Sequence, residues 1–205
     1  MTTDGTEITP REVLLAAQDR SLPYDQSGVT SALIKSIRGN DPDAAIWWLA
    51  TALEGGEDPR VIARRLLVSA SEDVGNADPA ALPLAAAAAQ VVELAGSPEC
   101  DWALAQAVTY LASAPKSPRA GEALAVAREQ IAMGGQLPVP GHLRASAKTY
   151  QSPHAAGEPF DIDQEYLPRE VATKRFYTPS GSGAEADLRD RIAALRAARA
   201  KGAKS

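Results

Sequence analysis

The sequence predicts an all-α protein, in which about seven helices precede an irregular arm rich in proline and glycine and a C-terminal helix. Three observations lead to this fold class. A polar residue followed by proline, a pair typical of a helix start, recurs six times along the chain. Apolar residues recur at helical spacing between these starts. No alternation typical of a β-strand occurs before residue 133.

Each start combines two physical effects. The polar side chain accepts a hydrogen bond from one of the first backbone N–H groups, and proline occupies a position where its missing N–H costs nothing. The starts are Thr9-Pro10, Asp41-Pro42, Asp58-Pro59, Asp78-Pro79, Ser97-Pro98 and Ser117-Pro118. Together with a helix that ends at Gly39, they predict helices over 10–21, 29–38, 42–54, 59–73, 79–95, 98–113 and 118–132.

Two of these helices carry informative patterns. In the helix over 42–54, Ile46, Leu49 and Leu53 fall on one face, as expected for a helix that packs on a core. The helix over 59–73 is apolar on almost every side apart from Arg64 and Arg65, which is typical of a helix in the centre of a bundle.

The composition of the sequence changes after Gly134. Six prolines between residues 134 and 183 argue against long regular structure, with one short helix expected over 168–175. Half of the ten aromatic residues lie in this arm, so we expect the arm to pack on the helices. A Gly-Ser segment, 180–183, then precedes a helix predicted over 184–200.

Composition and charge restrict the function. The chain has 205 residues and a net charge of −5, and one cysteine and two histidines exclude a disulfide framework or a multi-thiolate zinc site. No apolar run is long enough to span a membrane, and no secretion signal is present, so we expect a cytoplasmic, nucleoid-associated protein. Residues 1–150 carry a net charge of −6, which disfavours extensive DNA binding. The basic C-terminal residues form either a solvated face or, at most, a weak and salt-sensitive DNA contact: Arg189, Arg191, Arg196, Arg199, Lys201 and Lys204.

The sequence contains no motif for a catalytic, cofactor or metal site. It has no glycine-rich phosphate loop and no histidine or cysteine spacing that suits a metal or a nucleophile–base pair, so we expect no enzyme activity and no ATP hydrolysis by this chain. One charged cluster is predicted to form a structural ion-pair network, with a surface for a partner subunit or a phosphate as the alternative: Lys35, Arg38, Arg64, Arg65, Glu72 and Asp73. A remote alternative is a small α-helical enzyme that uses Glu72 and Asp73 as paired carboxylates.

Two adjacent tryptophans predict an interface. Trp47 and Trp48 point about 100° apart on one helix, so one core face cannot hold both rings beside Ile46 and Leu49. One ring is left for another surface, and an exposed tryptophan beside apolar neighbours is typical of an oligomer interface.

Several longer strings resemble the C-terminal half of the replication-associated recombination protein A (RarA, also called MgsA) family. These are AAA+ ATPases related to clamp loaders and to the Werner-helicase-interacting protein. The strings are SALIKSIRGNDPDAAIWWLATALEGGEDPRVIARRL (31–66), ASEDVGNADPAAL (70–82), LAQAVTYLASAPKSPRA (104–120), VPGHLR (139–144), QEYLPREV (164–171) and KRFYTP (174–179).

The resemblance implies a division of the chain. Residues 1–24 look like the end of the ATPase lid and its connector, 25–133 a helical oligomerisation body, 134–183 a packed irregular arm, and 184–205 a basic C-terminal helix. The family's ATPase module binds ATP and Mg²⁺, and its motifs are not found in this sequence.

The resemblance also implies a function. It points to a non-catalytic oligomerisation and interaction region, a homotetramer, in an ATPase that acts in replication-fork maintenance, recombination and repair. DNA and replication-fork proteins would be partners of the full-length ATPase. The alternative is a stand-alone helical scaffold that binds a DNA-processing partner.

Overall fold

The computed structural model describes residues 24–152 and 164–202, and all regular secondary structure within them is helical. The all-α prediction is therefore confirmed. The helix expected over 10–21 and nearly all of the lid-like segment 1–24 lie outside the described residues. None of the helices in the described part of the chain is both long and apolar enough to cross a membrane.

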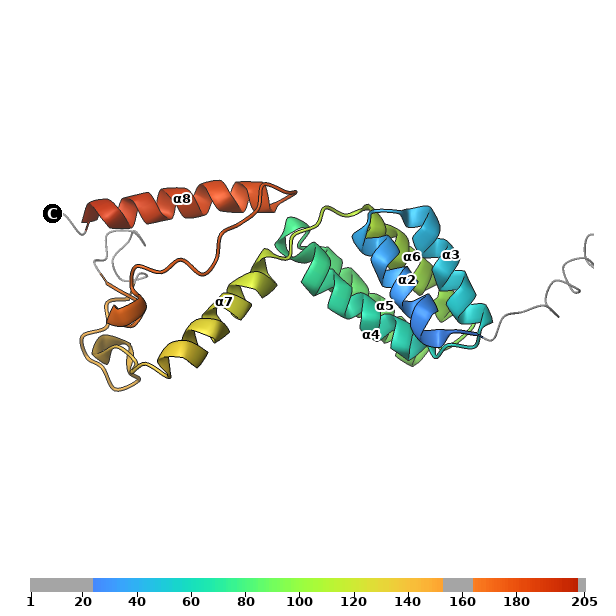
Figure 1. Ribbon diagram of the computed structural model, residues 1–205, viewed down its shortest axis with the longest axis horizontal. Coiled ribbons are helices and arrows are strands. Elements are labelled where there is room, and N and C mark those ends of the chain that lie inside the picture. Colours follow the sequence, from blue (N-terminus) through green and yellow to red (C-terminus); the bar gives the residue numbers. More distant parts are fainter. Residues whose placement is uncertain (1–23, 153–163, 203–205) are drawn as a thin grey trace, which may run out of the picture.

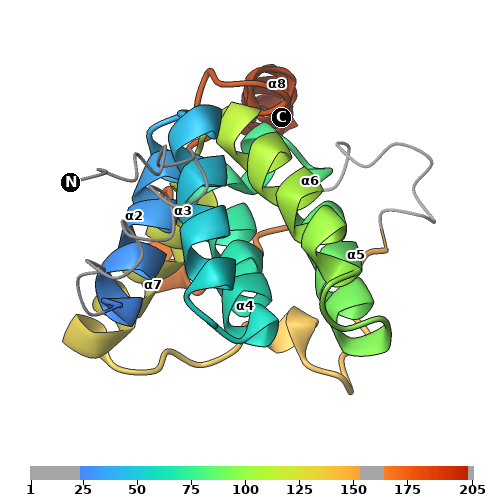
Figure 2. The same cartoon turned by 90° about the vertical axis from the view of Figure 1, so that its right-hand side faces the viewer.

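Five helices form a compact bundle (Figures 1 and 2). They are α2 (Gln26–Arg38), α3 (Pro42–Glu54), α4 (Pro59–Ser69), α5 (Ala81–Leu94) and α6 (Cys100–Ser113). Helix α6 contacts each of the other four, whereas α4 contacts α2, α5 and α6. The central position expected for the helix over 59–73 therefore belongs most fully to α6.

Large aliphatic side chains and alanines share the core of the bundle. Side chains from α2, α4 and α6 fill its middle, and alanines on α3, α5 and α6 allow the helix axes to approach closely. The fully buried large residues are Leu33, Ile37, Ile62, Leu66, Leu104 and Leu111. This composition agrees with a chain that has few aromatic residues and much alanine.

Aspartate caps fix the first three helices of the bundle. Asp41 accepts a hydrogen bond from the Ala44 N–H at 2.9 Å, and Asp58 accepts one from the Arg60 N–H at 2.8 Å, so the starts at Pro42 and Pro59 are confirmed. Helix α2 begins three residues earlier than expected because Asp25 caps it in the same way.

The starts predicted at Pro79 and Pro98 are each two residues early, and the one predicted at Pro118 is one residue early. Asp78 accepts a hydrogen bond from the Ala80 N–H at 3.0 Å, which keeps Pro79 in the preceding turn, and α5 begins at Ala81. Pro98, which follows a cis peptide bond, also lies before its helix, and α6 begins at Cys100.

The helix predicted over 59–73 is interrupted. Helix α4 ends at Ser69, and the chain widens into a π-helical turn over Ala70–Val74 before a 3₁₀ turn over Gly75–Ala77. The wider turn places the Asp73 side chain in the interior, where it meets Arg38 and Ser69.

Two long helices, joined by the arm, project from the bundle (Figure 1). Helix α7 (Arg119–Gly134) runs away from the bundle, and the arm turns at its far end and returns to the bundle. Helix α8 (Glu185–Gly202) then runs outward again. The sequence placed residues up to 133 in the helical body, but α7 has no buried residue.

The arm has less helix than expected. A single 3₁₀ turn over Arg169–Val171 replaces the helix predicted over 168–175, and a 3₁₀-type hydrogen bond joins the Val171 N–H to the Pro168 carbonyl. Part of the arm lies beside α7, where Leu167, Val171 and Phe176 line an apolar cleft of about 600 Å³ together with Ile131.

Candidate functional site

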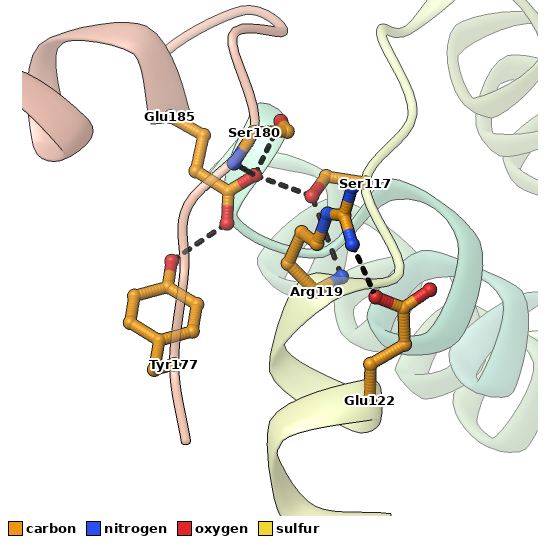
Figure 3. A network of polar contacts seen from close by, with 6 residues as sticks. All are labelled: Ser117, Arg119, Glu122, Tyr177, Ser180 and Glu185. Atoms are coloured by element: carbon orange, nitrogen blue, oxygen red, sulfur yellow. Dashed lines mark hydrogen bonds and ion pairs between the residues drawn. The ribbon is translucent and has the colours of Figure 1, made fainter. Parts of the chain in front are cut away.

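A buried carboxylate joins the starts of α7 and α8 (Figure 3). Glu185, the first residue of α8, is completely buried. Its carboxylate accepts hydrogen bonds from the Ser117 hydroxyl, from the Ser180 hydroxyl and N–H at 2.5 and 3.0 Å, and from the Tyr177 hydroxyl at 2.6 Å. We call Glu185, Ser117, Ser180 and Tyr177 the Glu185 network. It joins the α6–α7 connection, the arm and α8 at one point.

The hydrogen bonds stabilise the charged form of Glu185. Burial by itself raises the pKa of this carboxyl group, but the donors from Ser117, Ser180 and Tyr177 outweigh it and lower the pKa from 4.5 to about 2. Burial and the bond to Glu185 raise the pKa of Tyr177, so the phenol keeps the proton that it donates. The site is therefore a fixed anion with neutral donors around it.

The backbone closes tightly around the same point. The Ala184 N–H donates to the Ala77 carbonyl at 2.8 Å, and Gly183 has a φ of +52°. A Cβ on Gly183 would clash with the Ala77 carbonyl oxygen and the Pro115 ring, so this position requires glycine.

A second buried carboxylate lies on the bundle side of Ser117. Asp73 accepts hydrogen bonds from Arg38 Nε at 2.6 Å and from the Ser69 hydroxyl at 2.8 Å, and its backbone carbonyl accepts one from the Ser117 N–H at 2.8 Å. The bond to Asp73 raises the pKa of Arg38. Ser117 thus connects the Asp73 carbonyl to the Glu185 network through its own backbone and side chain.

The structure forms part of the predicted ion-pair network. Arg38 pairs with Asp73 and reaches Glu72 at 4.0 Å. The other three cations of the predicted network make no ion pair within the described residues: Lys35, Arg64 and Arg65. Both arginines are exposed on α4, which ends before residue 70. The sequence analysis did not identify Ser69 and Ser117 as partners of the buried carboxylates, because nothing in the sequence indicates that their short side chains are buried.

The paired-carboxylate alternative finds no matching geometry. Asp73 is buried and bonded to Arg38 and Ser69, whereas the Glu72 side chain is 63% exposed. In the described ranges, 24–152 and 164–202, no group of three or more histidine, cysteine, aspartate and glutamate residues is arranged to hold a metal ion.

The two tryptophans separate as their spacing predicts. Trp48 packs partly buried against the core, whereas Trp47 is 68% exposed on the outer face of α3. The sequence analysis missed two further exposed apolar side chains: Leu94 and Trp102 are 88% and 80% exposed and lie on either side of the turn from α5 to α6. The spacing of apolar residues did not indicate that these two side chains are exposed, because apolar residues occur on nearly every side of α5.

Helix α7 exposes apolar side chains on two opposite faces. Leu124 and Ile131 lie seven residues apart on one stripe, and Val126 and Met133 lie seven residues apart on the other, about 180° to 200° around the helix. All four are exposed, with Met133 at 71%. Within this chain, neither stripe is buried.

The basic residues of α8 have different environments. Arg189 pairs with Asp190 at 3.0 Å, and Arg191 is exposed near Asn76 and Pro79. Arg196 donates to the Tyr177 carbonyl at 2.7 Å, and the Arg199 guanidinium lies 5.2 Å from the centroid of the Tyr166 ring. The backbone of Lys201 belongs to α8, and Lys204 lies outside the described residues.

The structure defines a class of protein: an all-α bundle with two long projecting helices and several exposed apolar side chains. Comparison with known families places it more closely. The family model for the C-terminal region of the MgsA AAA+ ATPases matches residues 39–196. The chain therefore belongs to this family.

Curated relatives agree with this assignment. The Replication-associated recombination protein A of Coxiella burnetii is 40% identical over 82% of this chain, and that of Escherichia coli K12 is 36% identical over 93%. The ATPase WRNIP1 of Dictyostelium discoideum is 38% identical over 83% of the chain. The matches cover 40%, 46% and 21% of these three relatives, so the chain spans less than half the length of each.

Proposed function

We propose that this chain is a non-catalytic oligomerisation and interaction region of an AAA+ ATPase that acts in replication-fork maintenance, recombination and repair. The ATPase, which binds ATP and Mg²⁺, would supply the chemistry, and this region would set how its subunits assemble. The observation that carries the proposal is α7, a helix of 16 residues without a buried residue.

The two apolar stripes of α7 support assembly of more than two subunits. Burying a large aliphatic side chain is worth about 1.5–3 kcal/mol, so four uncovered ones favour association. Because the stripes lie on opposite sides of the helix, one neighbour cannot cover both. Two different neighbours can, as in a tetramer built from two kinds of two-fold contact. Trp47 adds a further exposed apolar surface on the bundle.

Light scattering on the purified chain tests the proposal. We expect a mass close to four times 21.5 kDa at micromolar concentration. Met133→Glu places a charge on one stripe and should lower the mass, while Ala132→Glu, its neighbour between the stripes, serves as the matched control. Trp47→Ala should raise the dissociation constant of assembly by about tenfold or more.

The outcomes separate the parts of the proposal. A monomer mass for the unmodified chain would contradict the oligomerisation role, and a dimer would contradict only the stoichiometry. Equal loss of mass in the Met133 and Ala132 variants would mean that α7 tolerates no new charge, and the stripes would then not be the interface.

A further inference from the structure

The end of the bundle that lies away from α7 and α8 has an acidic surface (Figures 1 and 2). Three segments form it: 24–28 at the start of α2, 54–60 at the turn from α3 to α4, and 93–102 at the turn from α5 to α6. A hydrogen bond from Gln26 to Glu57 and an ion pair between Arg60 and Glu93 join the three segments. We call this surface the acidic end.

Carboxylates outnumber cations by seven to one in these segments. Arg60 is their single cation, and it is already paired with Glu93 at 3.2 Å. The acidic end therefore has a negative potential, which attracts a cationic partner and repels a second acidic end. The seven carboxylates belong to Asp25, Glu54, Glu57, Asp58, Glu93, Glu99 and Asp101.

The acidic end also exposes large apolar side chains. Leu94 and Trp102, at 88% and 80%, are the two most exposed large apolar residues in the described part of the chain. Tyr24, whose ring lies against Gly55, is 38% exposed. An exposed tryptophan among apolar and charged neighbours is typical of a surface that binds another protein.

Glu57 has a buried oxygen that lacks a donor. The residue is 5% exposed, and its Oε1 accepts hydrogen bonds from Gln26 Nε2 at 2.8 Å and from the Asp58 N–H at 3.2 Å. Its Oε2 is buried and accepts no hydrogen bond from the residues that the structure describes. Such an acceptor costs free energy, which a donor on a docked partner would recover.

We propose that the acidic end docks the ATPase module that the proposed function places before this region, through a face of that module that carries basic and apolar side chains. This inference rests on the proposed function. The described chain enters the bundle at this end, because Tyr24 leads directly into α2. A module joined there by a short connector has an effective concentration of about 1 mM, so even a weak contact forms.

A second copy of this chain is the less favoured occupant. Pairing of two acidic ends would bring seven carboxylates of each copy together, which opposes association. Docking of the ATPase module would also leave α7 free for assembly, because α7 begins at the opposite end of the bundle.

Hydrogen exchange measured by mass spectrometry tests the docking, on this chain alone and on the longer ATPase of the proposed function. We expect peptides covering 93–102 to exchange about tenfold slower in the ATPase, whereas peptides covering the last turn of α6 should not change. Trp102→Ala and Glu99→Lys should each remove most of this difference. Both side chains are exposed, so neither change removes a core contact.

Asp43→Lys is the matched control. It makes the same charge reversal on an exposed carboxylate at a helix start, but α3 begins at the other end of the bundle, where Asn40 binds the Ala112 carbonyl. This variant should keep the slow exchange of 93–102. Equal effects of Glu99→Lys and Asp43→Lys would overturn the proposal, because the effect would then be one of total charge.

Two other results would overturn the docking. One is equal exchange of 93–102 in the chain alone and in the ATPase. The other is slow exchange in the chain alone that becomes faster on dilution, because a second copy would then cover the acidic end. Light scattering on the same samples reports the proposed function separately: a tetramer with an uncovered acidic end would contradict the docking and leave the oligomerisation role intact.

Discussion

Replacing Glu185 by glutamine should release α8 from the bundle. The substitution keeps the size of the side chain but removes its charge and turns one acceptor oxygen into an amide donor. That donor would face the hydroxyl groups of Ser117 and Ser180 or of Tyr177, all of which donate to the carboxylate. At least one buried hydrogen bond is then lost and one donor is left unpaired.

The pKa of Glu185 gives the magnitude. A shift from 4.5 to about 2 corresponds to about 3.5 kcal/mol of stabilisation of the charged form, at about 1.4 kcal/mol for each pKa unit. Because the carboxyl group is fully buried, little of this is screened by water. The free energy of opening at the N-terminus of α8 should fall by about this amount, which corresponds to amide exchange that is roughly 300-fold faster.

Hydrogen exchange measured by mass spectrometry would show this effect. Peptides covering the N-terminal turns of α8 should exchange faster in Glu185→Gln, while peptides from α4 should not change. Asp187→Asn, an exposed carboxylate on the same helix, is the control and should behave like the unmodified chain. Unchanged protection of α8 in Glu185→Gln would refute the role of the network.

The lowered pKa of Glu185 also predicts how the stability of the α8 N-terminus depends on pH. The folded pKa is lower than the unfolded one, so the contribution of Glu185 is complete above about pH 5 and is lost as the pH falls toward 2. Protection of α8 in the unmodified chain, corrected for intrinsic exchange, should fall through this window. The difference from Glu185→Gln should disappear at its lower end.

Two further substitutions test the neighbourhood of the network. Gly183→Ala should lower the free energy of opening of α8 by more than about 1 kcal/mol, because φ at this position is +52° and the new methyl group would clash with the Ala77 carbonyl. Gly181→Ala is the control and should have a smaller effect, because φ at Gly181 is not positive. Equal protection of α8 from hydrogen exchange in the two variants would contradict this prediction. Arg38→Ala should lower the free energy of urea unfolding by about 2 kcal/mol, because Asp73 stays buried with one partner lost, whereas Lys35→Ala should leave the urea midpoint unchanged.

Local signals predicted the bundle well. Asp41 and Asp58 mark helix starts because a cap acts within three residues, and this information is present in any short window of sequence. The π-helical turn after Ser69 was not predictable in this way. It depends on Asp73 meeting Arg38 from a helix 35 residues earlier, and the sequence continues a helical pattern there without interruption.

The same distinction between local signals and long-range contacts applies to the candidate sites. Successive residues of a helix point about 100° apart, so the sequence alone predicted that Trp47 and Trp48 lie in different environments. Glu185 was missed because an acid in the first turn of a helix is already favoured by the helix dipole, which hides a second role. Its partner Ser117 lies 68 residues away, and only the fold brings them together.

The position of the Glu185 network gives α7 and α8 one common pivot. Helix α7 starts two residues after Ser117, and α8 starts at Glu185, so both long helices leave the bundle from the same place (Figure 3). With 16 residues, α7 is about 24 Å long. A tilt of about 10° at its base would move its far end by roughly 4 Å. Small changes of packing around two serines would therefore produce larger displacements at the far ends of both helices.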